Sequence, residues 1–335
     1  MTEADIHGAI DELMARRSLL VEATRSAIRR VCADDPSLRD AVLKLLDADS
    51  SAVSHHRLLA CPITGMLAGD PGLALPVCVV SRIWWAGAET LDDLLDEQFD
   101  TGSAAMTRAA ATVAGAACIT LLPQAFVAEH GYAKDLETLL TRELTQGALH
   151  AADGQLADLS ESSRDSFSWK QVMTSYVGKT GAAYGRDAAM AAHLAGASAS
   201  ASRGWRTLGR LFGVLRQTAN DRAYPTAEQD ADLRNGTRTL LLAYALESAE
   251  PYEAETLVKW SDAARHDMTA RQELWDRLHG PAVAHGYNRR LRRIHGHVSG
   301  LLEQLAPPST QRDLLQWMID TSVVDSKVNP LGGGV

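Results

Sequence analysis

The stretch "ETLDDLLDEQFD", Glu89 to Asp100, carries six acidic side chains in twelve residues. On a helix, Asp92 and Asp96 are four residues apart and share one face, Asp93 lies a step aside, and Glu89 lies one turn before Asp92. Like charges at this spacing repel one another. The segment is therefore either an ordinary surface helix with an acidic end near its N-terminal caps, or a set of carboxylates that binds a cation.

The residues before the acidic stretch favour the second interpretation. Trp84, Trp85, Gly87 and Ala88 precede it, and they would form an apolar floor beneath a polar rim. Carboxylates at the edge of an apolar pocket require a cation. Carboxylate oxygens suit Mg²⁺, which also keeps water and phosphate oxygens as ligands.

The rest of the chain has the composition of an all-α protein. It has 335 residues, of which 46% are apolar and 5% aromatic. Runs typical of strands are scarce, and "VCVV" at 77–80 is the sole strand-like patch. We expect one all-α domain of ten or more helices over residues 1–328 and a disordered tail over 329–335. The helices are expected at about 3–32, 36–46, 57–68, 73–98, 103–129, 134–159, 168–195 and 198–225, with further helices after 235.

Charge and cysteine content limit the partners and the compartment. The net charge of −9 would repel a phosphate polymer, so we expect no nucleic acid partner. The four cysteines show no C-x-x-C spacing, which is typical of unbridged thiols in the cytoplasm. The most membrane-like window, 104–127, contains Arg108 and Pro123. It predicts a buried core helix rather than a stable membrane span.

Two polar features interrupt later apolar segments. Gln217, Asn220 and Asp221 occupy positions i, i+3 and i+4 of a helix and form a polar facet. Lys179 and Thr180 lie between two glycines in "VGKTGAAY". A lysine in an apolar helix is unfavourable unless its charge is matched, and a diphosphate bridged by Mg²⁺ to two acidic helices would match it.

The order and spacing of these motifs resemble the all-α polyprenyl (isoprenyl) diphosphate synthase family. The resemblance covers residues from about 55 to 245 and includes both of its aspartate-rich motifs, the second in a Q-x-x-N-D form. Five blocks carry it: "LDDLLDEQ", "GQLADL" (154–159), "VGKTGAAY" (177–184), "GVLRQTANDRAY" (213–224) and "DLRNGTRTLLL" (232–242).

The resemblance implies the isoprenoid synthase fold, a helical barrel in which two acidic helices face each other across a cavity. It implies three Mg²⁺ ions on the diphosphate of a small prenyl substrate, and a homodimer. The predicted catalytic residues are Asp92, Asp96 and Lys179. The predicted metal ligands are Asp92, Asp93, Asp96, Asn220, Asp221 and Glu228; the diphosphate contacts are Lys179, Thr180, Gln217 and Arg238; and the cavity residues are Trp85, Ala88, Tyr184 and Phe212.

The chain departs from the family where a second diphosphate would bind. Chain-elongating members carry a G-G-K-R-x-R-P block for isopentenyl diphosphate, and here "SHHRLLACP" keeps only Arg57 of its cations. The R-R-G block is missing. The lysine of the last block is Thr237, with Arg238 beside it. The closing aspartate of the second motif is Tyr224, although Glu228, eight residues after Asn220, resembles the last ligand of the terpene cyclase metal motif.

These departures predict a terpene cyclase that ionises a C15 or C20 allylic diphosphate and closes the carbocation on itself. Aromatic side chains such as Trp85 would then stabilise the cation, unless that tryptophan only fills the core. The alternatives are a prenyltransferase with a different acceptor, such as an indole or a peptide, and an ordinary polyprenyl diphosphate synthase. A non-catalytic partner of an active homologue is the remaining hypothesis.

Overall fold

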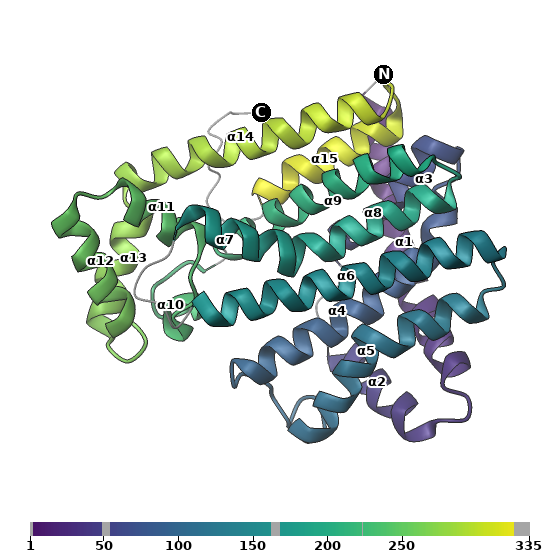
Figure 1. Ribbon diagram of the computed structural model, residues 1–335, viewed down its shortest axis with the longest axis horizontal. Coiled ribbons are helices and arrows are strands. Elements are labelled where there is room, and N and C mark those ends of the chain that lie inside the picture. Colours follow the sequence, from purple (N-terminus) through teal and green to yellow (C-terminus); the bar gives the residue numbers. More distant parts are fainter. Residues whose placement is uncertain (1–2, 49–53, 162–167, 223, 325–335) are drawn as a thin grey trace. The chain divides into compact units, whose positions relative to one another are not determined.

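The computed structural model describes residues 3–48, 54–161, 168–222 and 224–324, and helices dominate them (Figure 1). These ranges contain no β-strand, so the all-α prediction is confirmed, and the strand-like "VCVV" lies inside a helix. The predicted tail, 329–335, lies outside the described residues. The elements are α1 Glu3–Val31, α2 Pro36–Ala48, η1 His55–Leu58, α3 Ala60–Ala68, η2 Pro71–Ala74, α4 Leu75–Leu95, α5 Arg108–Glu129, α6 Lys134–Glu161, α7 Trp169–Tyr176, η3 Val177–Gly181, α8 Ala182–Leu194, α9 Ala199–Asn220, α10 Ala231–Asn235, α11 Leu240–Ser248, α12 Pro251–Ala263, α13 Met268–His279, α14 Pro281–Leu305 and α15 Thr310–Val324.

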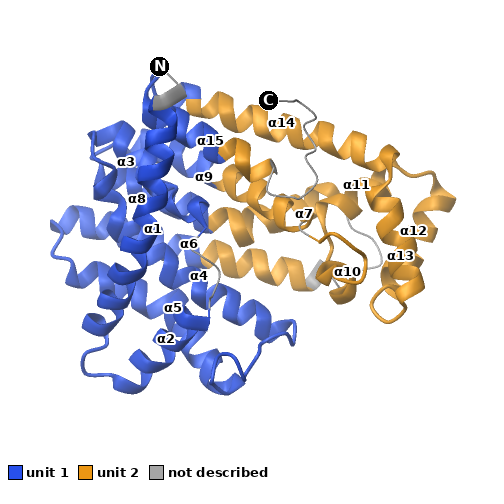
Figure 2. Cartoon of the chain, turned by 180° about the vertical axis from the view of Figure 1, so that it is seen from behind, with its two compact units in different colours: residues 1–148, 183–209, 303–318 blue, residues 149–182, 210–302, 319–335 orange. Residues whose placement is uncertain are grey.

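The contacts divide the chain into two compact units, each assembled from separate parts of the sequence (Figure 2). Unit 1 consists of residues 1–148, 183–209 and 303–318, and unit 2 of 149–182, 210–302 and 319–335. The first acidic stretch belongs to unit 1. Lys179, Asn220 and Asp221 belong to unit 2. The single domain over 1–328 stays a prediction.

In unit 1, α4 packs closely on α5 at Gly87. A Cβ atom at Gly87 would lie 2.6 Å from the Cβ of Cys118 and 2.6 Å from the backbone oxygen of Gly115. Both distances are far below van der Waals contact, so the position requires a residue without a side chain. The small size of Gly87 is thus explained by helix packing, and it does not by itself leave room for a long substrate.

Helix α5 is the one helix in the described ranges that is long and apolar enough to cross a membrane by length and composition. Half of its most apolar window is buried within the protein, and core helices of globular proteins meet the same criterion. Its buried side includes Ala111, Ala114 and Cys118, while Val113 and Leu121 are 68% and 64% exposed. The four cysteines are free, as predicted, and all four are buried.

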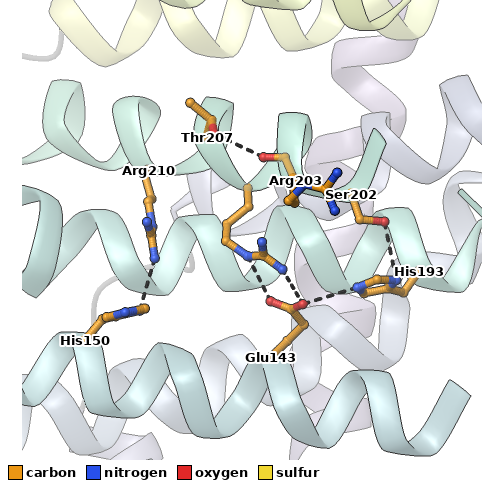
Figure 3. A network of polar contacts seen from close by, with 8 residues as sticks. Glu143, His150, His193, Ser202, Arg203, Thr207 and Arg210 are labelled. Atoms are coloured by element: carbon orange, nitrogen blue, oxygen red, sulfur yellow. Dashed lines mark hydrogen bonds and ion pairs between the residues drawn. The ribbon is translucent and has the colours of Figure 1, made fainter. Parts of the chain in front are cut away.

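A buried ionic network joins α6, α8 and α9 of unit 1 (Figure 3). Glu143 is 1% exposed, accepts a hydrogen bond from the Nε of Arg206 at 3.0 Å, and lies 3.2 Å from the Nε2 of His193. The Nδ1 of His193 in turn lies 3.3 Å from the hydroxyl of Ser202. Burial alone would raise the pKa of Glu143, but the hydrogen bonds from His193 and Arg206 outweigh it and lower that pKa.

We expect Glu143→Gln to lower the free energy of unfolding by about 2–3 kcal/mol at neutral pH, because it leaves a mostly buried guanidinium without its anion. A carboxylate with a lowered pKa stabilises the fold above its unfolded pKa, about 4.3, and loses that effect as the pH falls through the folded value. Urea unfolding at several pH values should therefore show the difference from wild type shrinking below about pH 4. Glu137→Gln, on the same helix beside the exposed Lys134, is the control and should have little effect. A pH-independent difference for Glu143→Gln would contradict the ionic origin.

Unit 2 has its own apolar core, built from α7, α11, α13 and α14. Its buried members include Val172, Tyr176, Leu240, Leu274 and Tyr287. The start of α7 forms a capping box: the side chain of Ser168 accepts from the backbone N–H of Gln171, and the Gln171 side chain accepts from that of Ser168. This cap fixes the direction in which the chain enters the segment around Lys179.

Candidate active site

The first acidic segment lies at the C-terminal end of α4. The helix ends at Leu95, Asp96 is its C-cap, and Glu97 has a φ of 60°. Asp92 is half-buried, whereas Asp93 and Asp96 are exposed. A helix C-terminus carries partial negative charge, which disfavours acidic side chains. The interpretation of this stretch as an acidic end near N-terminal caps is therefore wrong.

The three carboxylates are close enough to influence one another. Desolvation raises the pKa of Asp93 first, and the charges of Asp92 and Asp96 raise it further. A cation at this helix end would relieve both the mutual repulsion and the unfavourable helix dipole. A set of carboxylate oxygens fits Mg²⁺, which takes such ligands together with water and phosphate oxygens.

Glu89, one turn earlier, is neutralised within unit 1. Its carboxylate pairs with the guanidinium of Arg57, whose side chain is 13% exposed. The same guanidinium carbon lies 5.4 Å from the ring centroid of Trp85. Arg57, the one cation left from the isopentenyl diphosphate block, is therefore held by the chain's own acid and an aromatic face.

Trp85 belongs to an aromatic cluster beneath the acidic residues. Its ring centroid lies 5.1 Å from that of Trp84, in an edge-to-face arrangement, and 5.5 Å from that of Tyr184. Trp84 and Tyr184 are buried, and Trp85 and Ala88 are half-buried. Phe212 is fully buried in unit 2. The packing shows an aromatic wall at Trp85 and Tyr184, while the role of all four residues as a substrate cavity stays a prediction.

In unit 2, glycines bring three helical segments into backbone contact around Lys179. Residues 177–181 form a π-helical turn, a rare form that occurs mostly as single turns inside α-helices and frequently at functional sites. A Cβ at Gly154 would lie 2.3 Å from the backbone nitrogen of Lys179, and one at Gly213 would lie 2.7 Å from the Cα of Gly181. Gly154 of "GQLADL" and Gly213 of "GVLRQTANDRAY" are thus required by packing.

This turn presents Lys179 to the end of α6. Its ammonium lies 3.3 Å from the Oδ2 of Asp158, the aspartate of "GQLADL", and both side chains are largely buried. The charge of the lysine is therefore matched within unit 2 without a ligand. An anionic substrate at this position would compete with Asp158 for it.

A chain of hydrogen bonds connects the same turn to the end of α9. The hydroxyl of Thr180 donates to the Oε1 of Gln217 at 2.6 Å, and the Nε2 of Gln217 donates to the Oδ1 of Asp221 at 3.2 Å. The other oxygen of Asp221 accepts from the hydroxyl of Tyr176 at 2.5 Å. Burial, followed by the charge of Asp232, raises the pKa of Asp221 well above its usual range. The polar facet predicted for Gln217 and Asp221 therefore faces other protein groups.

Sequence reasoning missed Tyr176. It assigned this residue no role, yet a buried tyrosine hydroxyl usually requires a hydrogen-bond partner. That requirement was the available signal. The partner could not be named because Asp221 is 45 residues away.

The remaining predicted residues differ in accessibility. Asn220, the last residue of α9, and Glu228 are exposed, so both are accessible for metal binding. Tyr224 is half-buried. Arg238 is 6% exposed and donates to the hydroxyl of Ser261 on α12 at 2.7 Å, which counts against its predicted contact with diphosphate. Metal binding by Asn220, Asp221 and Glu228 stays a prediction.

The family model for polyprenyl synthetases matches residues 101–277, more than half of the 335 residues. The chain belongs to the polyprenyl synthetase family. The match includes Lys179, Gln217 and Asn220, whereas Asp92 and Asp96 lie before its first residue. For this polyprenyl synthetase family member, the role of the first acidic segment therefore rests on its own sequence and geometry. A comparison with curated protein sequences found no match.

Solved structures show the same fold. A polyprenyl synthetase from Streptomyces coelicolor A3(2) superimposes with a TM-score of 0.80 at 21% identity, covering 94% of this chain and 99% of that one. Geranylgeranyl pyrophosphate synthetase from Pyrococcus horikoshii Ot3 gives 0.79 at 18% identity, with coverage of 94% and 99%. The Corynebacterium glutamicum geranylgeranyl pyrophosphate synthase, solved with isoprenyl diphosphate and magnesium, gives 0.72 at 16%, with coverage of 91% and 98%. The predicted family and isoprenoid synthase fold are confirmed.

Proposed function

We propose that this enzyme ionises an allylic prenyl diphosphate with the help of Mg²⁺. The observation that carries the proposal is the group of carboxylates, Asp92, Asp93 and Asp96, at a helix C-terminus, where a bound cation would relieve their mutual repulsion and the unfavourable helix dipole. Bound Mg²⁺ would neutralise charge on the diphosphate, which otherwise is a poor leaving group.

Different residues of the chain would bind the metal and the diphosphate group of that substrate. In unit 1, Asp92 and Asp96 would hold metal. In unit 2, Asn220 would hold metal, with Glu228 as an accessible further oxygen ligand. Lys179 would leave Asp158 for a diphosphate oxygen, since a dianion offers it more negative charge. Thr180 and Gln217 would orient the same group. These donors stabilise the charge that develops as the allylic C–O bond breaks.

The fate of the prenyl cation follows from the acceptor. The family match, together with the likeness to diphosphate synthases, favours transfer of the prenyl group to isopentenyl diphosphate over the cyclisation predicted from the sequence. Transfer to isopentenyl diphosphate lengthens the chain. We therefore propose chain elongation as the first candidate reaction.

Cyclisation is the second candidate, and Arg57 favours it. A second diphosphate needs cations, and Arg57 is already paired with Glu89 and stacked on Trp85. Trp85 and Tyr184 also offer aromatic faces, which stabilise carbocations. A prenyltransferase that uses an indole or a peptide would be consistent with the same features.

An acceptor assay tests these alternatives. The protein is incubated with Mg²⁺ and a C10, C15 or C20 allylic diphosphate, with and without isopentenyl diphosphate, and diphosphate release and organic products are measured. A longer diphosphate formed with isopentenyl diphosphate supports elongation, and a cyclic hydrocarbon or alcohol without an acceptor supports cyclisation. No metal-dependent diphosphate release under either condition would overturn the proposal and favour a non-catalytic subunit.

We also propose a homodimer in the cytoplasm. The exposed side of α5 carries Val113 and Leu121, apolar residues that a second copy of the chain would cover. The buried free thiols suit a reducing compartment.

A further inference from the structure

The hydroxyl of Tyr176, the residue just before the "VGKTGAAY" block, connects two other sequence blocks of the family resemblance. It donates to the Oδ2 of Asp221, in the second acidic motif, at 2.5 Å. It accepts from the backbone N–H of Leu240, in the last block, at 3.3 Å. Tyr176 itself ends α7, three residues before Lys179. One buried oxygen atom thus joins α7, the end of α9 and the start of α11, all within unit 2.

The hydrogen bond to Leu240 satisfies a group that its helix cannot satisfy. Leu240 is the first residue of α11, and the first N–H groups of a helix have no intrahelical acceptor. The side chain of Thr239, the N-cap, accepts from the N–H of Leu242. Tyr176 therefore completes the N-terminal cap of α11 from another helix.

A second tyrosine in the same core shows that packing alone does not explain the hydroxyl. Tyr287 is 1% exposed and belongs to the same apolar cluster, and its hydroxyl has no hydrogen-bond partner among the described residues. The core therefore accommodates a tyrosine whose hydroxyl makes no hydrogen bond. The two contacts of Tyr176 are a property of that position.

The consequence concerns the last turn of α9. The Gln217 amide and the Tyr176 hydroxyl each donate to one oxygen of Asp221, so the side chain of Asp221 is held on the protein side. Asn220, the preceding residue, points about 100° away around the helix axis. It is exposed, whereas Asp221 is 6% exposed. Fixing Asp221 inward therefore fixes Asn220 outward.

We propose that Tyr176 is a positioning residue for metal binding by the second acidic motif, acting through Asp221 on Asn220. The proposal rests on the proposed function, since it assumes that Asn220 holds Mg²⁺. In this arrangement Asp221 supports the site from behind rather than serving as a ligand. Without the Tyr176 hydroxyl, the last turn of α9 must be ordered when the metal binds, and the apparent affinity for Mg²⁺ falls.

The test compares Tyr176→Phe with the matched control Tyr287→Phe. Each variant removes one hydroxyl from a buried ring in the same core. We expect Tyr176→Phe to raise the Mg²⁺ concentration for half-maximal diphosphate release about tenfold, as the loss of one buried hydrogen bond would. Tyr287→Phe should leave that concentration unchanged. A purely structural role would lower the melting temperature without changing the Mg²⁺ dependence.

Two readouts without turnover separate this inference from the proposed function. Amide hydrogen exchange should be faster at Leu240 in Tyr176→Phe alone, and the rise in melting temperature caused by Mg²⁺ with inorganic pyrophosphate should be smaller in that variant alone. Wild-type protein without diphosphate release would overturn the proposed function and this inference with it. An active Tyr176→Phe variant with the wild-type Mg²⁺ dependence and the wild-type pyrophosphate shift would overturn only the role of Tyr176.

Discussion

Asp92→Asn is expected to lower the rate of Mg²⁺-dependent diphosphate release by about 10²–10³-fold, because it removes a carboxylate from the proposed metal site. The fold should persist. Asparagine has nearly the same shape, and the change removes one of the like charges that crowd the C-terminal end of α4. We therefore expect the melting temperature to stay the same or rise slightly. The measurements are a diphosphate release assay and thermal unfolding followed by circular dichroism.

Asp11→Asn provides a matched control for this variant. Asp11 is an exposed carboxylate on α1 of the same unit, with no ion pair among the described residues. The Asp11→Asn variant should keep wild-type activity. If Asp92→Asn also kept full activity, that carboxylate would have no part in the mechanism. If it unfolded the protein, the acidic cluster would be a structural feature.

Gly154→Ala is expected to produce the largest loss of stability. The added Cβ would lie 2.3 Å from the backbone nitrogen of Lys179 and 2.5 Å from the carbonyl carbon of Gly178. These are backbone atoms of the π-helical turn, so no flexible side chain can move aside. Overpacking of this kind lowers the free energy of unfolding by about 1–3 kcal/mol, and a backbone clash places this variant at or above the upper end. Urea unfolding monitored by circular dichroism measures the change.

Gly300→Ala on α14 is the control for a glycine within a helix. A Cβ at Gly300 would meet no atom within 4 Å. Alanine has the higher helix propensity, so this variant should be more stable by up to about 1 kcal/mol. Equal effects of the two substitutions would show that the contact between α6 and η3 does not limit stability.

Local patterns predicted most of the helices. The predicted segment 3–32 is α1, residues 3–31, and the helix expected from 168 begins with a capping box at Ser168, whose two partners lie within one turn. The predicted helix over 73–98 instead ends at Leu95, where the C-cap conformation of Asp96 and the positive φ of Glu97 end it. Helix ends of this kind depend on surrounding packing, which a hydrophobic pattern does not contain.

The acidic residues of the candidate site were predictable from the sequence, but the contacts that hold the surrounding side chains in place were not. Asp92 and Asp96 stand out because charged residues interrupt an apolar stretch. The contacts of Arg57 with Glu89 and of Tyr176 with Asp221 join residues far apart in sequence, so spacing alone could not identify them. The contact of Arg238 with Ser261 likewise joins residues far apart in sequence, so spacing could not identify it either.

The π-helical turn at 177–181 also fixes the number of residues in this segment. Removing a single residue there would restore a regular α-helix and rotate everything after it by about 100° relative to what precedes it. Thr180 and Tyr176 would then no longer meet Gln217 and Asp221 together. This short segment should therefore tolerate neither insertion nor deletion, even where its side chains can be exchanged.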